Sequence, residues 1–493
     1  MTCAPQAAAR AAASPRESSA IAAHPTPMLA DAPGQVNATR TDPDAPRLRI
    51  AIMPAVRRVA WFSPLPPVRS GISAYSADLL PLLRGRAEVD PFDEAHAHDF
   101  VWKHRTRPYD LVVYQLGNSA CHDYQWAYLT RYPGLVVLHD AQLHQSRALG
   151  LLQRQRHREY REEFAFSHPG APAGLADLVI AGLGGSLYYL WPMLGAVMAA
   201  SRVVAVHNDT LAGDLRARFP AVPVEAIRMG VPAVPADAGA RASVLARHAI
   251  PPGSTVMACF GRLTPEKRIG VVLGALGRVS RLRPDVHLLL VGEPGEGYDV
   301  RREAREAGVE DRVTLAGFVP ERDLPAYLLA ADVCLCLRWP TSGETSASWL
   351  RCLAAGRPTV VTTLVQMAGV PRLDPRSWSL VGDPASGDES ASDEAVSVSV
   401  DLADEDRSLE LAMTRLASDP GLRERLGARA RAYWAREHTL DRMLADYERV
   451  IARAIDAPGR AAPGLPAHFR DDTTWFARRL VEPFGVSLDF LAS

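Results

Sequence analysis

Residues 255–291 read TVMACFGRLTPEKRIGVVLGALGRVSRLRPDVHLLLV, and this stretch decides the fold. It begins and ends with apolar runs of strand length, at 255–260 and 286–291. Between these runs, apolar residues recur at steps of three and four, which gives a helix one apolar face for a sheet to cover; they are Ile269, Val272, Leu276 and Val279. A strand, a helix and a second strand in this order predict two parallel strands joined by a crossover helix.

The same alternation continues on both sides of this stretch. Further apolar strands are predicted downstream at 313–316, 333–337 and 359–362, and upstream at 58–62, 111–114, 135–138 and 202–206. A connector rich in Pro, Ala and Gly at 231–240 separates the two groups. The predicted fold class is therefore α/β, with two doubly wound, Rossmann-like domains that face a cleft.

The length of 493 residues fits more than one domain. The first 47 residues have almost no bulky apolar side chains, so they cannot bury enough surface to fold. Four segments are predicted: a disordered tail at 1–47, an N-terminal domain at 48–235, a C-terminal domain at 245–430, and helices with a tail at 431–493 that are expected to cross back to the N-terminal domain.

Several segments outside the predicted strands also have a distinctive composition. The stretch at 383–393 is acidic and rich in Gly and Ser, which predicts a flexible insertion, and 409–455 predicts two or three helices. Residues 178–201 carry no charge, but glycines and a proline interrupt them, so we predict a Gly-rich loop and a buried helix, with membrane-surface contact as the alternative. Aromatic residues near the end are available to dock on the body: Trp475, Phe476, Phe484 and Phe490.

Composition excludes several classes of function. With 55 Lys and Arg against 56 Asp and Glu, the net charge is -1, which gives no field for holding a nucleic acid. None of the six cysteines forms a CxxC pair, so neither a zinc site nor a dithiol is indicated, and a reducing cytoplasm fits. Cys334 and Cys336 are expected on one face of a buried strand.

Ligands of open parallel sheets bind beyond the carboxyl ends of the strands, so residues that follow an apolar run are candidates. After the 255–260 strand, Arg262 can bind phosphate oxygens bidentately and Lys267 adds a second positive charge. Thr264 as N-cap and Pro265 as first helical residue predict a helix start there, whose partial positive charge favours anions. We favour diphosphate binding over ordinary surface cations.

Three other strand ends carry weaker signals. After the 333–337 strand, Glu344 is either a capping acid or an acceptor for sugar hydroxyls, and the amides of Thr345 and Ser346 would face a phosphate. Gly71 lets the backbone approach a ligand closely in the loop after the first strand. His139 ends the 135–138 strand, where it is either a structural histidine or a group that polarises a hydroxyl.

Taken together, these motifs resemble the GT-B glycosyltransferases, specifically the large retaining family 4, over about 58–451. The resemblance rests on the Gly-rich first loop, His139, Gly261-Arg262 with Lys267, Gly292 after LLLV, Gly317-Phe318-Val319, the Glu344 loop and LAAGRP at 353–358. It implies an enzyme that moves a hexosyl group from a nucleotide-diphosphate sugar to a hydroxyl acceptor with retention of configuration. The N-terminal domain would take the acceptor and the C-terminal domain the nucleotide-sugar.

By that resemblance, Arg262 and Lys267 would hold the diphosphate, the backbone at Phe318 and Val319 would meet the base, and Gly71 would lie near the phosphates. His139 would lie near the transferred sugar, and Glu344 would take part in binding it. No cofactor or metal is expected, because positive side chains can stabilise the leaving diphosphate. The expected partners are the donor and a sugar, lipid-linked sugar or other hydroxyl acceptor. The location would be cytoplasmic, with peripheral contact at the inner face of a membrane.

The sequence departs from the family pattern at one point. The family usually has two glutamates eight residues apart, and Gly343 and Arg351 stand at those positions. Glu344 is one residue from the first, but an arginine replaces the second, so two alternatives stay open. One is a non-catalytic protein that binds sugar-nucleotides, and the other is a sugar-nucleotide epimerase of the same architecture, which needs paired carboxylates where the first half offers chiefly Asp140.

Overall fold

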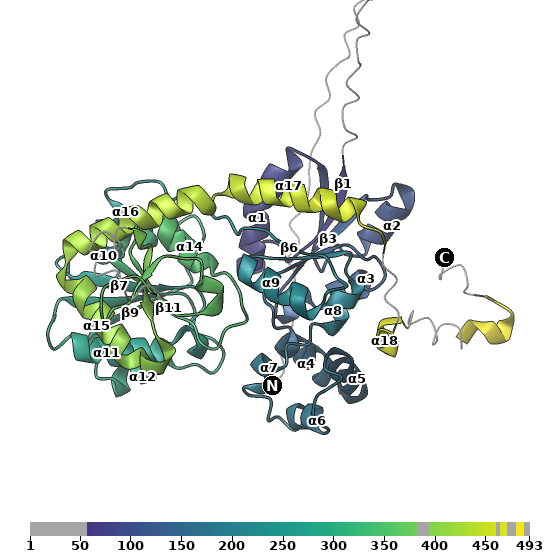
Figure 1. Ribbon diagram of the computed structural model, residues 1–493, viewed down its shortest axis with the longest axis horizontal. Helices are drawn as coiled ribbons and strands as arrows, with labels where there is room; N and C mark the ends of the chain where they lie inside the picture. Colours follow the sequence, from purple (N-terminus) through teal and green to yellow (C-terminus); the bar gives the residue numbers. More distant parts are fainter. Residues whose placement is uncertain (1–56, 382–393, 460–463, 471–479, 488–493) are drawn as a thin grey trace, which may run out of the picture. The chain divides into compact units, whose positions relative to one another are not determined.

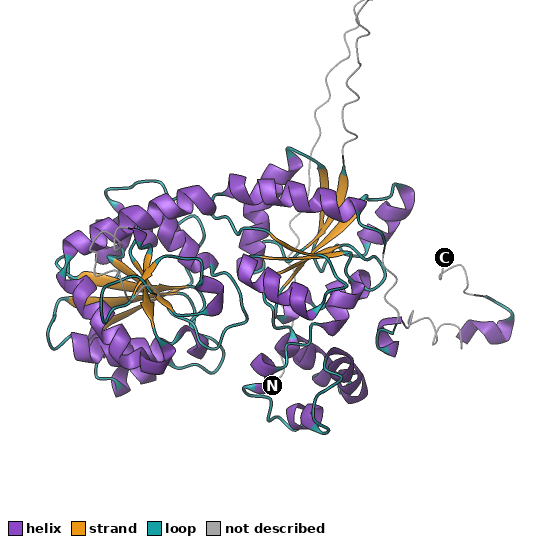
Figure 2. Cartoon of the chain, in the orientation of Figure 1, coloured by secondary structure: helices purple, strands orange, loops and turns teal. Residues whose placement is uncertain are grey.

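The computed structural model describes residues 57–381, 394–459, 464–470 and 480–487. Two parallel sheets, each covered by helices on both faces, make up this part of the chain (Figures 1 and 2). The predicted tail at 1–47 and the predicted insertion at 383–393 lie outside the described residues. The α/β class with two Rossmann-like sheets is confirmed.

The first sheet has the order β2-β1-β3-β4-β5-β6, and every pair in it is parallel. Its strands are β1 (Arg58–Phe62), β2 (Glu88–Phe92), β3 (Leu111–Leu116), β4 (Leu135–Leu138), β5 (Val203–Val206) and β6 (Val224–Ala226). The helices between them are α1 (Gly71–Arg84), α2 (Asp99–Thr106), α3 (Gln125–Leu129), α4 (His144–Leu152), α5 (His157–Ser167), α6 (Leu175–Ile180), α7 (Leu187–Leu190), α8 (Gly195–Ala200) and α9 (Asp209–Arg218). A short 3-10 helix, η1 (Ala120–His122), follows β3.

The second sheet has the order β12-β13-β11-β10-β7-β8-β9 and is also parallel. Its strands are β7 (Thr255–Phe260), β8 (Val286–Val291), β9 (Val313–Gly317), β10 (Val333–Cys336), β11 (Thr359–Thr362), β12 (Arg372–Leu373) and β13 (Ser397–Val400). Its helices are α10 (Ala240–Arg247), α11 (Ile269–Val279), α12 (Val300–Glu306), α13 (Leu324–Ala330) and α14 (Ala347–Ala354), with 3-10 turns η2 (Pro265–Lys267), η3 (Glu310–Arg312) and η4 (Val365–Met367).

The stretch quoted first folds as predicted from its apolar spacing. The four residues that define the apolar face of α11 are fully buried in one hydrophobic cluster with β7 and β8. Cys334 is buried on β10, and the sulfur of Cys336 on the same face lies 4.0 Å from that of Cys352. These cysteines therefore act as small apolar side chains, as expected.

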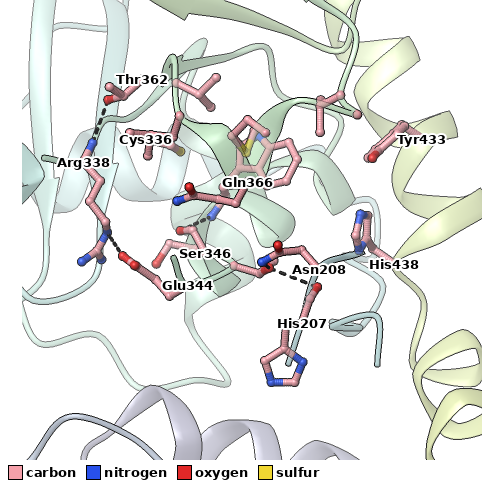
Figure 3. Close-up of a pocket in the computed structure, with 18 of the residues that line it drawn as sticks. His207, Asn208, Cys336, Arg338, Glu344, Ser346, Thr362, Gln366, Tyr433 and His438 are labelled. Carbon is pink, nitrogen blue, oxygen red and sulfur yellow. Dashed lines mark hydrogen bonds and ion pairs between the residues drawn. The ribbon is translucent and has the colours of Figure 1, made fainter. Parts of the chain in front are cut away.

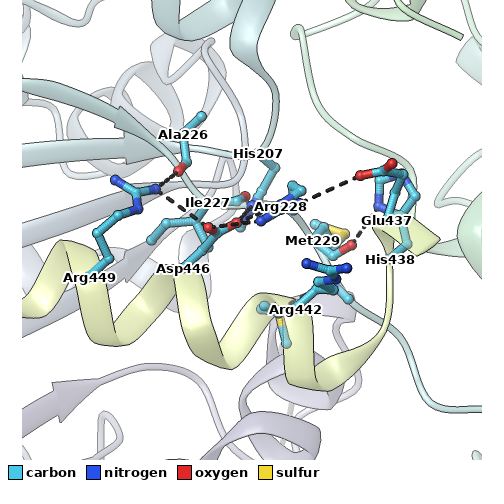
Figure 4. A network of polar contacts seen from close by, with 12 residues as sticks. His207, Ala226, Ile227, Arg228, Met229, Glu437, His438, Arg442, Asp446 and Arg449 are labelled. Atoms are coloured by element: carbon cyan, nitrogen blue, oxygen red, sulfur yellow. Dashed lines mark hydrogen bonds and ion pairs between the residues drawn. The ribbon is translucent and has the colours of Figure 1, made fainter. Parts of the chain in front are cut away.

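Three helices follow the second sheet: α15 (Glu405–Ser418), α16 (Pro420–Glu437) and α17 (Leu440–Asp456). Helix α17 packs against α1 and β3 of the first sheet. Figure 4 shows how its Asp446 holds the segment after β6, accepting hydrogen bonds from the backbone N and from Nε of Arg228 at 3.0 and 2.9 Å. Arg449 of the same helix donates to the carbonyl of Ala226 at 2.8 Å. The domain boundaries predicted above stay predictions.

Two local predictions differ from the structure. The charge-free segment at 178–201 holds the short helices α6, α7 and α8 instead of one loop and one helix, and α8 is the buried one. Phe484 is 83% exposed, so its predicted docking is wrong, while Trp475, Phe476 and Phe490 lie outside the described residues. No helix in the described ranges is long and apolar enough to cross a membrane.

Candidate functional site

A pocket of about 380 Å³ lies beyond the carboxyl ends of β5, β7, β10 and β11, next to the first turn of α14. Figure 3 shows residues from several elements in its wall, among them His207, Arg338, Glu344 and Ser346. This is the position at which open parallel sheets place their ligands. The pocket therefore lies at the edge of the second sheet to which the strand-end argument pointed.

Lys267 supplies a positive charge to this pocket. Its Nζ donates a hydrogen bond to the backbone carbonyl of Phe260, the last residue of β7. Burial and the nearby Arg338 lower the pKa of the Lys267 ammonium to about 8. The pocket wall thus carries a cation with little solvent around it, which increases its attraction for an anion.

Arg262 lies elsewhere. Its side chain is exposed and lies outside the pocket wall, and across the described ranges it has no hydrogen-bond or ion-pair partner. The backbone beside it is tightly packed. A Cβ on Gly292 would lie 2.2 Å from the carbonyl oxygen of Gly261, and the backbone φ of Gly292 is 152°. Glycine after β8 is therefore required by the close approach of two strand ends.

The predicted helix start after β7 is present only as a short 3-10 turn, with Thr264 at its N-cap position and Pro265 as its first residue. Thr264 precedes a 3-10 turn and its side chain makes no cap hydrogen bond, while α11 begins only at Ile269. Arg268, between the two, has a left-handed backbone with φ 58°, and its guanidinium pairs with Glu405. The partial charge of a helix amino end is therefore absent at Thr264, and the local positive charge comes from side chains.

Glu344 is bound by its own loop. Its Oε2 accepts hydrogen bonds from the backbone N of Ser342 at 2.7 Å and from the hydroxyl of Thr341 at 3.0 Å. Its Oε1 lies 2.6 Å from Nε of Arg338. The N-cap of α14 is Ser346, whose Oγ accepts from the backbone N of Trp349. Glu344 thus holds the loop in shape and forms an ion pair with Arg338.

The Glu344 loop also contacts strand ends of the first sheet. The carbonyl of Ser342 accepts from the backbone N of Ala141 at 2.8 Å, and that of Gly343 accepts from Nδ2 of Asn208 at 3.1 Å. The hydroxyl of Thr345 donates to the carbonyl of His207 at 3.2 Å. Thr345 and Ser346 therefore line the pocket, at a place where residues of both sheets meet.

His139 is buried and does not line the pocket. Its Nε2 lies 2.8 Å from Oε1 of Gln115, and its Nδ1 lies 3.2 Å from Nε2 of His207. Both ring nitrogens are therefore used within the protein. His207, at the end of β5, is the histidine that reaches the pocket, and the same strand-end rule would have found it had it been applied to that strand.

The other predicted residues lie apart from this pocket. Gly71 is the exposed first residue of α1. Phe318 is 45% exposed, and the guanidinium of Arg69 lies 4.2 Å above its ring, while Val319 packs against a core cluster. The structure therefore brings together Lys267, Glu344, Thr345 and Ser346, and leaves outside the pocket His139, Gly71, Arg262, Phe318 and Val319.

Arg351, the residue that departs from the family pattern, is paired. Its guanidinium lies 3.5 Å from Asp78 of α1 and also contacts Glu321. The side chain of Arg351 is only 15% exposed. Two carboxylates thus offset the reversed charge at this position.

Comparison with known proteins finds a family match within the second sheet of the chain. A family model for glycosyl transferases group 1 matches residues 254–386, which span β7 to β12. This part of the chain therefore resembles the group 1 glycosyltransferases. Lys267 and the Glu344 loop therefore lie inside the group 1 domain.

Two curated relatives extend this likeness. The D-inositol 3-phosphate glycosyltransferase of Segniliparus rotundus is 28% identical over 279 residues, 55% of this chain and 57% of the relative. A GDP-mannose-dependent phosphatidylinositol monomannoside mannosyltransferase of Mycobacterium tuberculosis is 30% identical over 153 residues, 29% of this chain and 40% of the relative. The chain thus spans about half the length of the curated relatives it matches.

Solved structures show the GT-B fold for the group 1 domain together with the first sheet. Sucrose-phosphate synthase from Thermosynechococcus elongatus matches with a TM-score of 0.55 and 16% identity, covering 82% of this chain and 100% of the other. An Anabaena protein in complex with UDP and glucose matches with a TM-score of 0.53 and 13% identity, covering 80% and 100%. At this identity the likeness concerns the fold alone.

Proposed function

We propose that the protein transfers a hexosyl group from a nucleotide-diphosphate sugar to a hydroxyl acceptor. One observation carries the proposal: a half-buried cation, Lys267, lies beyond the end of β7 within the residues that the group 1 family model matches, facing the first turn of α14. A diphosphate carries the opposite charge, and a site shielded from water strengthens the attraction. The names of the curated relatives, which are glycosyltransferases, support the same reaction.

The proposed mechanism is electrostatic. As the bond from the sugar to the diphosphate breaks, negative charge builds up on the leaving oxygen, and Lys267 together with Arg338 would stabilise it. We assign the enzyme to family 4, with retention of configuration and without a metal ion. Within the described ranges, no three His, Cys, Asp or Glu side chains are grouped to hold a metal.

For the donor, we propose that Arg262 binds the diphosphate together with Lys267, that Thr345 and Ser346 add backbone amides, and that Phe318 and Val319 meet the base. Gly71 would lie near the phosphates and Glu344 near the sugar. His139 would lie near the transferred sugar. Both of its ring nitrogens contact other side chains, so its role would be to shape this side of the site.

For the acceptor, we propose a sugar, a lipid-linked sugar or another hydroxyl compound. Peripheral membrane contact is supported by exposed leucines on and beside α4, α6 and α7: Leu149, Leu178, Leu183 and Leu190. A second candidate function is binding of sugar-nucleotides without turnover. It is favoured by Arg351, whose positive charge stands where the family usually has a glutamate.

Incubation with nucleotide-sugars and candidate acceptors, followed by measurement of free nucleotide diphosphate, tests the proposal. Release that depends on an acceptor supports the transferase. Binding without release supports the second function. Formation of an isomerised sugar would show an epimerase and contradict both.

Replacing Arg262 by Gln is expected to weaken nucleotide-diphosphate binding by about 1–3 kcal/mol, the range for hydrogen bonds to charged groups. The reason is that its guanidinium has no partner in the described structure and is free to bind phosphate oxygens. Calorimetric titration with UDP and GDP measures the change. The matched control is Arg322→Gln, at another exposed arginine of the same domain, and equal affinities in both variants would remove Arg262 from the site.

A further inference from the structure

A chain of buried hydrogen bonds runs from α17 to the wall of the pocket. The hydroxyl of Tyr75 donates to that of Tyr447 at 2.7 Å, and Nε2 of Gln115 donates to Oη of Tyr447 at 3.1 Å. Gln115 contacts Nε2 of His139, whose Nδ1 contacts Nε2 of His207. All five side chains are buried, and the last of them lines the pocket.

At the His207 end of this series of hydrogen bonds, the position of one proton is determined by its partner. Nδ1 of His207 lies 3.0 Å from the backbone carbonyl of Ile227, which can only accept, so Nδ1 carries a hydrogen (Figure 4). Only one hydrogen fits between Nε2 of His207 and Nδ1 of His139. The protonation of the pair therefore depends on what Gln115 presents to the remaining nitrogen, Nε2 of His139.

The two orientations of the Gln115 amide give different charges. If the amide oxygen faces His139, Nε2 must carry a hydrogen as well, so two rings hold three protons and the pair is positive. If the amide NH₂ faces His139, Nε2 accepts, and the pair is neutral. The structure places the amide oxygen toward His139 at 2.8 Å and the NH₂ toward Tyr447 at 3.1 Å, which is the first orientation. Turning the amide by 180° exchanges the two atoms without moving the side chain and gives the second orientation. Tyr447 then donates to the amide oxygen, and Tyr75 donates to Tyr447.

The surroundings decide between these orientations. Around the pair lie the ring of Tyr75 at 4.8 Å, the amide of Gln115, the hydroxyl of Tyr447 and the imidazole of His122, and none of them is an anion. Asp140, the next residue after His139, accepts instead from the backbone N of Asn118 at 2.8 Å. A buried positive charge without a counter-ion is strongly disfavoured.

Burial acts on the histidines in the same direction. Burial, with the like charges that His207 and His122 would carry, lowers the pKa of His139 far below its usual range. Burial also lowers the pKa of His207 to about 4, although its hydrogen bond to Ile227 acts the other way. The pair is thus expected to hold no positive charge near neutral pH.

We propose that Gln115 and Tyr447 are positioning residues that hold His139 and His207 as a neutral pair, each protonated on Nδ1. Tyr447 belongs to α17, so a helix from the end of the described chain sets the state of two histidines in the first sheet. Neither histidine then keeps a free nitrogen that could take a proton from a substrate. One further consequence rests on the proposed function: an uncharged wall at His207 leaves the diphosphate to Lys267 and Arg338.

The first test is the nitrogen NMR spectrum of the full chain with labelled histidine, which distinguishes Nδ1–H, Nε2–H and imidazolium forms. Signals are assigned by their loss in His139→Gln and His207→Gln. We expect both residues as Nδ1–H tautomers between pH 6 and 8, about the usual titration range of histidine. An imidazolium or an Nε2–H form at either residue would overturn the proposal.

The second test changes the amide that sets the pair. In Gln115→Glu the carboxylate can only accept, so Nε2 of His139 must be protonated, and we expect its titration midpoint to rise by about 1–3 pH units. The control Gln125→Glu places the same charge at a residue that donates to the backbone carbonyl of Gln115 and contacts His122, not His139. An unchanged midpoint in Gln115→Glu contradicts the proposal.

A milder pair of variants covers the case in which Gln115→Glu does not fold. Tyr447→Phe removes the hydroxyl that holds the amide oxygen, so we expect His139 to lose its single tautomer. Tyr75→Phe removes only a donor to Tyr447 and should leave the tautomers unchanged. A single Nδ1–H form of His139 in Tyr447→Phe would remove Tyr447 from the proposal.

Turnover measurements separate this inference from the proposed function. In Gln115→Glu we expect kcat of the transferase to gain a pH dependence at the new titration midpoint of His139, while the control keeps the wild-type profile. A kcat profile that does not follow the new midpoint contradicts a positioning role. Nδ1–H signals in a wild-type protein without transfer to any acceptor would overturn the transferase and leave the neutral pair standing.

Discussion

Replacing Lys267 by Met is expected to lower kcat/KM for the nucleotide-sugar by about 10²- to 10³-fold, the usual cost of removing one preorganised group that stabilises developing charge. Met keeps most of the length and the apolar stem of the side chain and removes its charge. The loss should be this large because the ammonium lies in the pocket wall, where partial burial reduces screening by solvent. Initial rates of nucleotide-diphosphate release give the ratio.

The same residue predicts a pH dependence. Burial and Arg338 lower the pKa of Lys267 to about 8, so the ammonium loses its proton as the pH rises through that value. The charge that attracts the diphosphate is present below this pH and lost above it. We therefore expect KM for the donor to rise above about pH 8 in the wild type, and to stay flat in Lys267→Met.

The chain offers a matched control, because lysine occurs at only two positions, 103 and 267. Lys103 is exposed on α2, 5.3 Å from the ring of Phe92 and remote from the pocket wall. Lys103→Met should keep both the rate and its pH dependence. If both variants retain wild-type kcat/KM, the diphosphate does not bind at Lys267 and the proposed function loses its main support.

The strands that could be predicted were the ones with unbroken apolar runs. All nine predicted strands form, and those next to the pocket, β5, β7, β10 and β11, lie within about a residue of the predicted bounds. The four strands that were not predicted lie at or beside sheet edges and are short or polar: β2, β6, β12 and β13. In β2, Glu88 and Asp90 pair with Arg58, so edge contacts replace the apolar pattern that sequence reasoning needs.

The site was predictable only as far as local patterns reach. The strand-end rule pointed to Lys267 and the Glu344 loop, because both lie in segments that follow an apolar run. It could not tell that Arg338 would pair with Glu344 or that Arg262 would lie outside the pocket wall, since these depend on packing between loops. The contact between Gln115 and Tyr447 joins residues 332 positions apart and has no local signature.

Changing Glu163 to Gln is expected to destabilise the helices around α4 and α5 by about 3–5 kcal/mol, the usual cost of breaking a buried ion pair. Glu163 is 2% exposed as a side chain, and its Oε2 accepts from Nε of Arg147 at 2.9 Å. Arg147 is itself buried and lies 4.3 Å from the ring centre of Trp126. Without the carboxylate, the guanidinium would stay in the interior with its charge no longer neutralised by Glu163.

The pH dependence of this effect follows from the same pair. Burial opposes ionisation of Glu163, but Arg147 and His468 outweigh it and hold the pKa of the carboxyl below its usual value. A lowered pKa in the folded state stabilises the fold at pH values above the ordinary carboxyl range, and this is lost as the pH falls through the lowered value. The difference between wild type and Glu163→Gln should therefore be full at pH 7 and shrink in acid.

The neighbouring residue supplies the control, because Glu162 differs from Glu163 mainly in burial. Its side chain is 34% exposed and it pairs at 3.0 Å with Arg158, which is 80% exposed, so Glu162→Gln should cost only about 0–1 kcal/mol. Hydrogen exchange of the α4 and α5 backbone amides at pH 7 measures the local opening free energy in each variant. Equal protection in the two variants would mean that the Arg147–Glu163 pair does not stabilise these helices. It would also mean that the burial of a glutamate does not decide how much its replacement destabilises them.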